Sequence, residues 1–277
     1  MTDPPQLSEH ARRPPRRLLR RRQALVAIAT IVAGCGGGGG SSAPPLEGSI
    51  EGRSITSRIN GFTYPLSVYL PPASAGPRAN LPIVYALDGD WWFDQIVSIM
   101  ESTHARAIVV AIGFNANRAH DYVPTNTCTP NGGGHVAFFD FIRSELIPYA
   151  ESTIGGDATR RTLLGHSHGG SFVYYALFAE AAAQHHFAAY LASDASIACM
   201  PATVDDWEAT YAAANADLPV KLHVSYAANL TNADFAQRIR DRRYPNLAMQ
   251  AGFYSGGHTG MIPAAFTDAL GFALAAP

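Results

Sequence analysis

Short apolar runs alternate with longer segments of helical spacing along most of the chain. The runs at 81–87 ("LPIVYAL") and 106–113 ("RAIVVAIG") contain almost no polar position, as expected of strands buried on both faces. The segment 137–152 ("AFFDFIRSELIPYAES") instead gathers its large apolar residues on one side of a helix. The same reasoning predicts strands at 49–59, 63–71, 161–165, 187–193, 220–227 and 247–255, and helices at 168–183, 234–242 and 261–274. This alternation predicts an α/β fold with a mainly parallel sheet and helices on both faces.

From Leu46 onward the sequence shows no second linker, no repeat and no low-complexity run. We therefore expect one domain over 46–277. The segment 199–218 is the only candidate for a cap over a functional site, and it is short. The fold is thus expected to have a small lid or none.

The first 45 residues differ in composition from the rest of the chain. Seven arginines between Arg12 and Arg22 precede "QALVAIATIVAGC", whose apolar run is too short to span a membrane and has the order of an export signal. The ending "VAGC" resembles the lipobox of bacterial lipoproteins, and this resemblance implies that Cys35 carries lipid. Residues 1–34 would then be the signal peptide and 35–45 a flexible tether. The expected location is the periplasmic side of a bacterial membrane, with the lipid as the only membrane contact.

Charge and cysteine content narrow the possible partners. Without residues 1–34 the chain keeps 13 basic and 20 acidic residues, a net charge of −7. An acidic chain without a basic cluster is a poor nucleic-acid binder. Cys128 and Cys199 could form a disulfide in an exported protein, although the sequence leaves open whether they meet. No metal-ligand spacing and no nucleotide-binding loop is present, so neither a metal nor a cofactor is expected.

The stretch "TLLGHSHGGSFVYYALF" (162–178) contains the candidate nucleophile. Ser167 lies in the pattern Gly165-x-Ser167-x-Gly169, after an apolar strand and before a helix. This is the context of a nucleophile elbow, where glycines relieve crowding in a tight turn that exposes the serine hydroxyl. A plain glycine-rich turn is the competing interpretation. The strand-to-helix context favours the nucleophile.

A serine needs a base, which in this fold follows the last strand. Only His258, in "YSGGHTGMIPAAF", lies there. The backbone N–H of His168, at the start of the helix, and that of Asp90, in "YALDGDWWF", are the expected oxyanion donors. Trp91 is a candidate for the substrate wall, although a core position is an equally good interpretation of the aromatic residues that follow Asp90.

Several segments together resemble the esterase D/enterochelin-esterase group of α/β-hydrolases. They are "YALDGDWWF", "GGGHVAFFDFIRSELIPYAE", "RTLLGHSHGGSFVYYALF", "GGHTGMIPAAF" and the run from Asn117 to Thr125. The resemblance implies an α/β-hydrolase fold and a serine esterase that forms an acyl-enzyme on Ser167. It also implies that Arg118 and Tyr122 border the substrate cleft.

One position departs from that family's pattern. A carboxylate is expected after the seventh strand, where this chain reads "SYAANLTNADF". Asp234 is the nearest acid and is the first candidate for the third member of the triad. Asp194, in "ASDASIA", is the second candidate, and a Ser–His dyad remains a further alternative.

The expected function is hydrolysis of a small carboxylic ester. The competing hypothesis is a non-catalytic lipoprotein that keeps the fold to bind a ligand or a partner. The departure after the seventh strand supports that alternative, whereas the serine, the histidine and the elbow glycines favour the enzyme. An acyltransferase on the same site is a third possibility.

Overall fold

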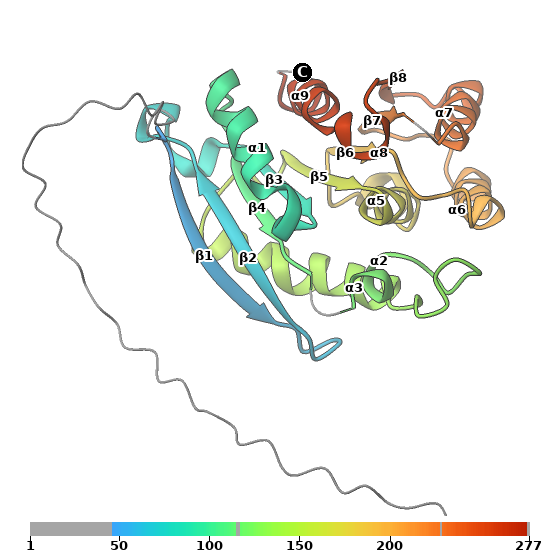
Figure 1. The fold of residues 1–277 in the computed structure, drawn as a ribbon, viewed down its shortest axis with the longest axis horizontal. Helices are drawn as coiled ribbons and strands as arrows, with labels where there is room; N and C mark the ends of the chain where they lie inside the picture. Colours follow the sequence, from blue (N-terminus) through green and yellow to red (C-terminus); the bar gives the residue numbers. More distant parts are fainter. Residues whose placement is uncertain (1–45, 115–116, 228, 276–277) are drawn as a thin grey trace, which may run out of the picture. The chain divides into compact units, whose positions relative to one another are not determined.

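The computed structural model describes residues 46–114, 117–227 and 229–275. The signal peptide, Cys35 and the tether expected from the sequence lie outside the described residues. Eight strands form one sheet in the order β1-β2-β4-β3-β5-β6-β7-β8 (Figure 1). The strands are β1 (Ser49–Thr56), β2 (Thr63–Leu70), β3 (Ile83–Leu87), β4 (Ile108–Ile112), β5 (Arg161–His166), β6 (Ala189–Ser193), β7 (Lys221–Tyr226) and β8 (Ala248–Phe253).

The sheet is parallel from β4 to β8 and antiparallel only at one edge, where β1 pairs with β2 and β2 with β4. Every residue of β3 and β4 is buried, as their continuous apolar runs predict. The expected mainly parallel α/β sheet is therefore confirmed, and this strand order with flanking helices is that of the α/β-hydrolase fold.

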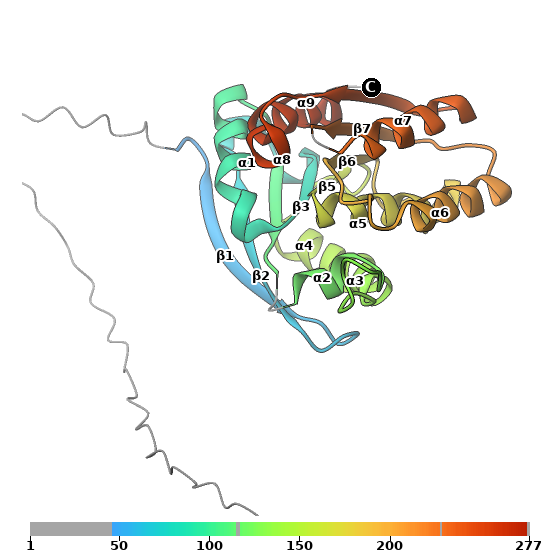
Figure 2. The ribbon, with the colours of Figure 1, turned by 45° about the vertical axis from the view of Figure 1, so that its right-hand side comes forward.

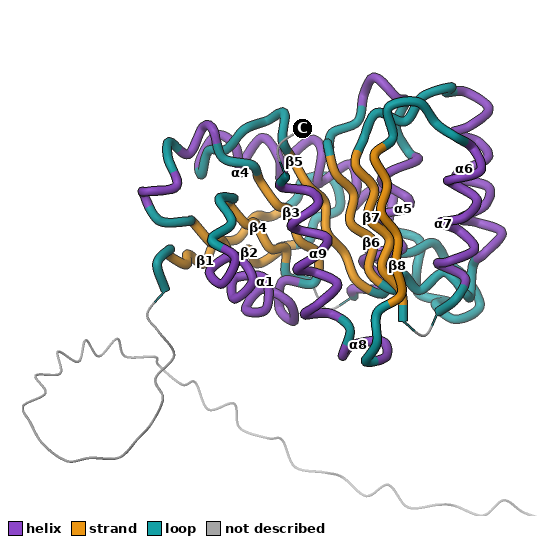
Figure 3. Tube along the Cα trace, turned by 90° about the horizontal axis from the view of Figure 1, so that it is seen from above, coloured by secondary structure: helices purple, strands orange, loops and turns teal. Residues whose placement is uncertain are grey.

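Helices cover both faces of the sheet. They are α1 (Gly89–Thr103), α2 (Arg118–Tyr122), α3 (His135–Phe141), α4 (Ile147–Thr153), α5 (His168–Phe178), α6 (Pro201–Ala214), α7 (Thr231–Arg242), α8 (Gly257–Gly260) and α9 (Ile262–Leu274). α1 and α9 pack their apolar side chains into one core layer, whereas α3 to α7 pack into the other (Figure 3). Among the described helices, none has both the length and the apolar character to cross a membrane.

Two segments differ in detail from what the sequence predicts. The segment 137–152 is helical throughout, but a π-helical turn over Ile142–Leu146 separates α3 from α4. The segment 199–218 contains α6, which lies beside α5 (Figure 2) and buries Val204 and Tyr211 in the core. α6 is therefore part of the core layer on that face of the sheet and does not form a cap.

The carboxyl ends of the parallel strands lie along one edge of the sheet, where candidate functional residues gather. α1 follows the carboxyl end of β3, and α5 follows the carboxyl end of β5. Both ends of the described chain leave from the opposite edge. Ser49 pairs with Leu70 beyond the amino end of β4, and Lys221, the first residue of β7, donates hydrogen bonds to carbonyls at the end of α9.

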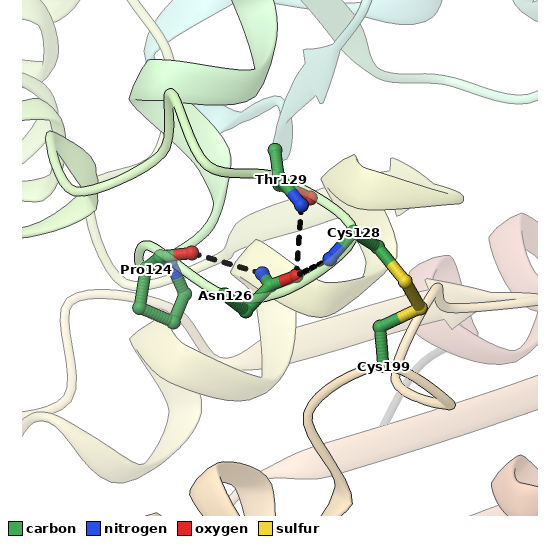
Figure 4. Close-up of a disulfide and its surroundings, with 5 residues drawn as sticks. All are labelled: Pro124, Asn126, Cys128, Thr129 and Cys199. Carbon is green, nitrogen blue, oxygen red and sulfur yellow. Dashed lines mark hydrogen bonds between the residues drawn. A yellow bond between two sulfur atoms is a disulfide. The ribbon is translucent and has the colours of Figure 1, made fainter.

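A disulfide joins two loops at the edge that carries α5. Cys128 lies between α2 and α3, and Cys199 lies directly before α6 (Figure 4). Oδ1 of Asn126 accepts hydrogen bonds from the N–H groups of Cys128 (2.9 Å) and Thr129 (3.0 Å), which shapes the first loop. The sequence left this pairing open, and the structure brings the two cysteines together.

Candidate active site

Ser167 occupies the turn between β5 and α5 in a conformation that few residues adopt. Its φ is 59° and its ψ is −121°. A Cβ on Gly165 would lie 2.3 Å from the carbonyl oxygen of Gly169, and a Cβ on Gly170 would lie 3.0 Å from Cα of Ala195. The strained serine persists because glycines allow this close backbone approach. The local structure is therefore the tight strand-to-helix turn expected of a nucleophile elbow.

His258 is held by a buried carboxylate. It lies on α8, after β8, and its Nδ1 is 2.6 Å from Oδ2 of Asp194. Asp194 follows β6 and is 1 % exposed, and its Oδ1 accepts a hydrogen bond from the N–H of Ala227 (3.0 Å). An ionised carboxylate only accepts, so Nδ1 carries the proton and Nε2 is left as the basic nitrogen.

Asp234 does not supply this carboxylate, contrary to the first expectation. It is exposed in the first turn of α7. Asn229 takes the place after β7 where the carboxylate was expected, and its Nδ2 donates to the carbonyl of Ala195 (3.0 Å). The amide thus braces the β6–α6 loop that carries Asp194, and the carboxylate comes from one strand earlier.

Two further histidines beside Ser167 are kept neutral by burial. The ring of His166 lies 4.5 Å from that of His258, and its Nδ1 is 3.2 Å from the hydroxyl of Ser193. Burial, and then the nearby His258, lower the pKa of His166 to about 3. Burial also lowers the pKa of His168 to about 4. A positive charge that forms on His258 would therefore meet no second imidazolium near neutral pH.

The expected oxyanion donors lie at two helix starts. The first N–H groups of a helix have no acceptor in a preceding turn, so those of His168 on α5 and of Gly89 and Asp90 on α1 are available to a ligand. Asp88 has a φ of 56° and begins the turn into α1, and its carbonyl accepts from the N–H of Trp91 (2.9 Å). Asp90 also fixes the neighbouring loop, since its Oδ2 accepts from the N–H of Phe114 (2.7 Å).

Arg118 lies against this turn, and its side chain is engaged mainly in contacts with it. Its guanidinium forms a two-point ion pair with the fully buried carboxylate of Asp88, in which Nη2 to Oδ2 measures 2.7 Å. It also lies 4.9 Å from the ring centre of Trp91, which is 53 % exposed. Arg118 therefore orders the turn that would hold the oxyanion, and Trp91 remains open to a ligand.

Tyr122 is not a cleft residue, contrary to expectation. It is 1 % exposed, and its hydroxyl accepts a hydrogen bond from the N–H of Asp88 (3.2 Å). It supports the turn from inside the core. The run of apolar and polar residues around it did not distinguish a buried tyrosine from a cleft tyrosine.

Sequence reasoning missed Ser196 and Asp88. The hydroxyl of Ser196 is 3.0 Å from that of Ser167. No local pattern marks a single serine or a single buried aspartate, because their roles arise from contacts with residues about 30 positions away. Among the described residues, no group of three histidine, cysteine or carboxylate side chains could hold a metal ion.

Comparison with known proteins identifies the family of this chain. The chain matches the family model described as "Putative esterase" over residues 57–226. It belongs to this esterase family. It is 29% identical to ferri-bacillibactin esterase BesA of Bacillus subtilis over 172 residues, which cover 53% of this chain and 58% of the relative. It is also 29% identical to the apo-salmochelin esterase of Escherichia coli over 122 residues, or 37% of this chain and 38% of the relative.

A solved structure has the same fold. The IroE-like serine hydrolase of Shewanella oneidensis superposes with a TM-score of 0.72 at 26% identity, over 80% of this chain and 79% of that one. The match to the two curated relatives spans between about two fifths and three fifths of their length. The comparison establishes the esterase family and the α/β-hydrolase fold.

Proposed function

We propose that this protein is a serine esterase that hydrolyses small carboxylic esters through an acyl-enzyme on Ser167. The observation that carries the proposal is the 2.6 Å hydrogen bond between His258 and the buried Asp194, beside a strained serine turn. An oriented base near a partly buried serine on a tight turn is the arrangement that activates a hydroxyl. We assign the third triad position to Asp194 rather than to Asp234.

Each step uses groups of this chain. The Ser167 hydroxyl attacks the ester carbonyl while its proton passes to Nε2 of His258, and Asp194 stabilises the imidazolium. The negative charge on the carbonyl oxygen is held by the N–H groups of His168 and Asp90. The C–O bond to the alcohol then breaks, and the alcohol leaves with the proton from His258. Water releases the acid by the same steps, with His258 again as the base.

The substrate is proposed from the relatives and from the rim of the site. The two curated relatives are named as a ferri-bacillibactin esterase and an apo-salmochelin esterase. Trp91 is 53 % exposed and offers an aromatic surface at the rim of the site, with the guanidinium of Arg118 4.9 Å from the centre of its ring. We propose an ester of a siderophore or of a similar small acyl compound as substrate, with Trp91 in contact with it.

Labelling with a fluorophosphonate tests the proposal. The folded domain 46–277 should be labelled, Ser167→Ala should abolish labelling, and His258→Ala should weaken it. Ester hydrolysis should disappear with the same variants. A folded wild-type domain that is neither labelled nor active would favour the non-catalytic binding protein instead.

We also propose that the protein is exported and lipid-anchored through Cys35, with residues 1–34 removed. The support is the sequence alone, namely the arginine-rich start, the short apolar run and "VAGC". Metabolic labelling of the full chain with a radioactive fatty acid should mark the wild type and not Cys35→Ser. Equal labelling of both would contradict the anchor.

A further inference from the structure

The loop between β6 and α6 contacts the nucleophile as well as the base. Asp194 at its start holds His258, as described above. Two residues later, Ser196 meets Ser167 at two points. The hydroxyl oxygens are 3.0 Å apart, and the N–H of Ser196 donates to the carbonyl of Ser167 (3.0 Å).

The position of Ser196 is fixed from several sides. The carbonyl of the preceding Ala195 accepts hydrogen bonds from Nδ2 of Asn229 and Nδ2 of Asn232, each 3.0 Å long. Cα of Ala195 packs so close to Gly170 that a Cβ there would be 3.0 Å away. Because the backbone on which Ser196 sits is held in this way, its contact with Ser167 is built into the fold and does not depend on a mobile loop.

A serine hydroxyl has one proton to donate, so the two hydroxyls form one hydrogen bond in one direction at a time. If Ser167 donated, its proton would point away from His258 and proton transfer would be blocked. If Ser196 donates, the proton of Ser167 remains free for Nε2 of His258. Only the second direction is compatible with attack by Ser167.

We infer that Ser196 is a catalytic residue whose hydroxyl donates to Oγ of Ser167. This inference rests on the proposed esterase function. As His258 removes the proton, negative charge grows on Oγ, and a donor at 3.0 Å stabilises it. When the new C–O bond forms, the charge moves to the carbonyl oxygen and the N–H groups take over. Ser196 keeps its proton throughout and acts again when Oγ becomes the leaving group in deacylation.

The test compares side chains of one shape with and without the hydroxyl. Ser196→Thr and Ser196→Val differ by a hydroxyl against a methyl group, and Ser196→Ala removes the group altogether. Ser152→Ala, on α4 outside the site, is the matched control for loss of a serine hydroxyl. The readouts are the second-order rate of fluorophosphonate labelling, kcat/KM on a soluble ester, and the melting temperature.

We expect Ser196→Ala and Ser196→Val to label about 10 to 100 times more slowly than wild type, as loss of a hydrogen bond to a charged group predicts. Ser196→Thr and Ser152→Ala should stay close to wild type. If Ser196→Ala does not fold, the labelling rates of Ser196→Thr and Ser196→Val test the inference. Equal or faster labelling of Ser196→Val relative to Ser196→Thr would overturn the inference while leaving the esterase proposal intact. A wild type that is not labelled would overturn the esterase proposal itself.

Discussion

Asp194 supplies the carboxylate beside His258 from a different loop than the one where the sequence pattern predicts an acid. The carboxylate that orients His258 comes from the end of β6, and Asn229 after β7 supports the same loop with an amide. Parallel neighbouring strands end at the same edge, so either loop can deliver an acid to the same histidine. Asp194 also needs a positive φ of 38°, a conformation that aspartate and asparagine tolerate better than most residues.

Replacing Asp194 tests its assigned role. Asp194→Asn removes the charge that stabilises the imidazolium and can favour the wrong tautomer of His258. We expect kcat to fall by about 10⁴-fold, as when a triad aspartate is replaced by asparagine. Asp234→Asn is the matched control and should stay within about twofold of wild type, because Asp234 is exposed on α7. A large loss with Asp234→Asn would instead support the first sequence-based assignment.

The ion pair between Arg118 and Asp88 leads to a second prediction at the scale of single residues. Arg118→Met leaves the buried carboxylate without its partner and should cost about 3 to 5 kcal/mol of the free energy of unfolding. Burial already raises the pKa of Asp88, and Arg118 opposes this shift. Without Arg118, Asp88 should keep its proton to a higher pH in the folded state than in the unfolded state. The free energy of unfolding lost in Arg118→Met should therefore grow as the pH rises from 4 to 8.

Urea unfolding of Arg118→Met at several pH values checks this prediction. Arg160→Met, on the opposite edge of the sheet, is the control for loss of an exposed guanidinium. The double variant Asp88→Asn/Arg118→Met should recover part of the stability. A pH-independent loss would show that packing of the arginine stem, rather than its charge, is what stabilises the turn.

At the scale of elements, the sequence predicted the strands and helices whose burial produces a regular pattern of apolar residues. β3 and β4 are buried on both faces, and their apolar runs reveal this directly. The tight turn at Ser167 has a local signature, because the close backbone approach leaves no room for a Cβ at Gly165. α2 (Arg118–Tyr122) escaped prediction because five residues are too few to show a helical period. Asp194 was only the second candidate for the acid and Ser196 was not assigned, because their roles depend on which loops meet at the edge of the sheet.

The disulfide links two of those loops, and its removal should lower stability. Cys128 and Cys199 are 71 positions apart, and a closed loop of this length is expected to stabilise a folded domain by up to about 4 kcal/mol. Cys128→Ser/Cys199→Ser should therefore melt at a lower temperature than the oxidised wild type. A reducing agent should lower the melting temperature of the wild type to that of the double variant and leave the variant unchanged. Equal melting of all samples would contradict a stabilising bridge.

At the scale of the whole molecule, buried neutral histidines should make the fold sensitive to acid. Burial lowers the pKa of His223, on β7, to about 4, against about 6.5 in an unfolded chain. Above pH 6.5 the His223 side chain is neutral in both the folded and the unfolded state, so it does not change the free energy of unfolding. As the pH falls below 6.5, His223 is protonated in the unfolded state but stays neutral in the folded state. The free energy of unfolding therefore decreases until the pH reaches about 4.

His223 alone should contribute about 2 kcal/mol to the loss of stability between pH 7 and pH 5. In His223→Gln the unfolding free energy should fall less steeply over this range than in the wild type. His104→Gln is the control, since the His104 side chain is 74 % exposed. Identical slopes for wild type and His223→Gln would contradict the prediction, whatever the absolute stability of the variant.

Both ends of the described chain leave the sheet at the edge opposite Ser167 and His258, and this arrangement has a practical result. A bead, an electrode or a carrier protein joined before Leu46 or after Ala275 would leave the edge that carries Ser167 and His258 facing outward. Such a fusion should bind bulky esters as freely as the isolated domain. The domain is thus suited to surface display through either terminus without redesign of its loops.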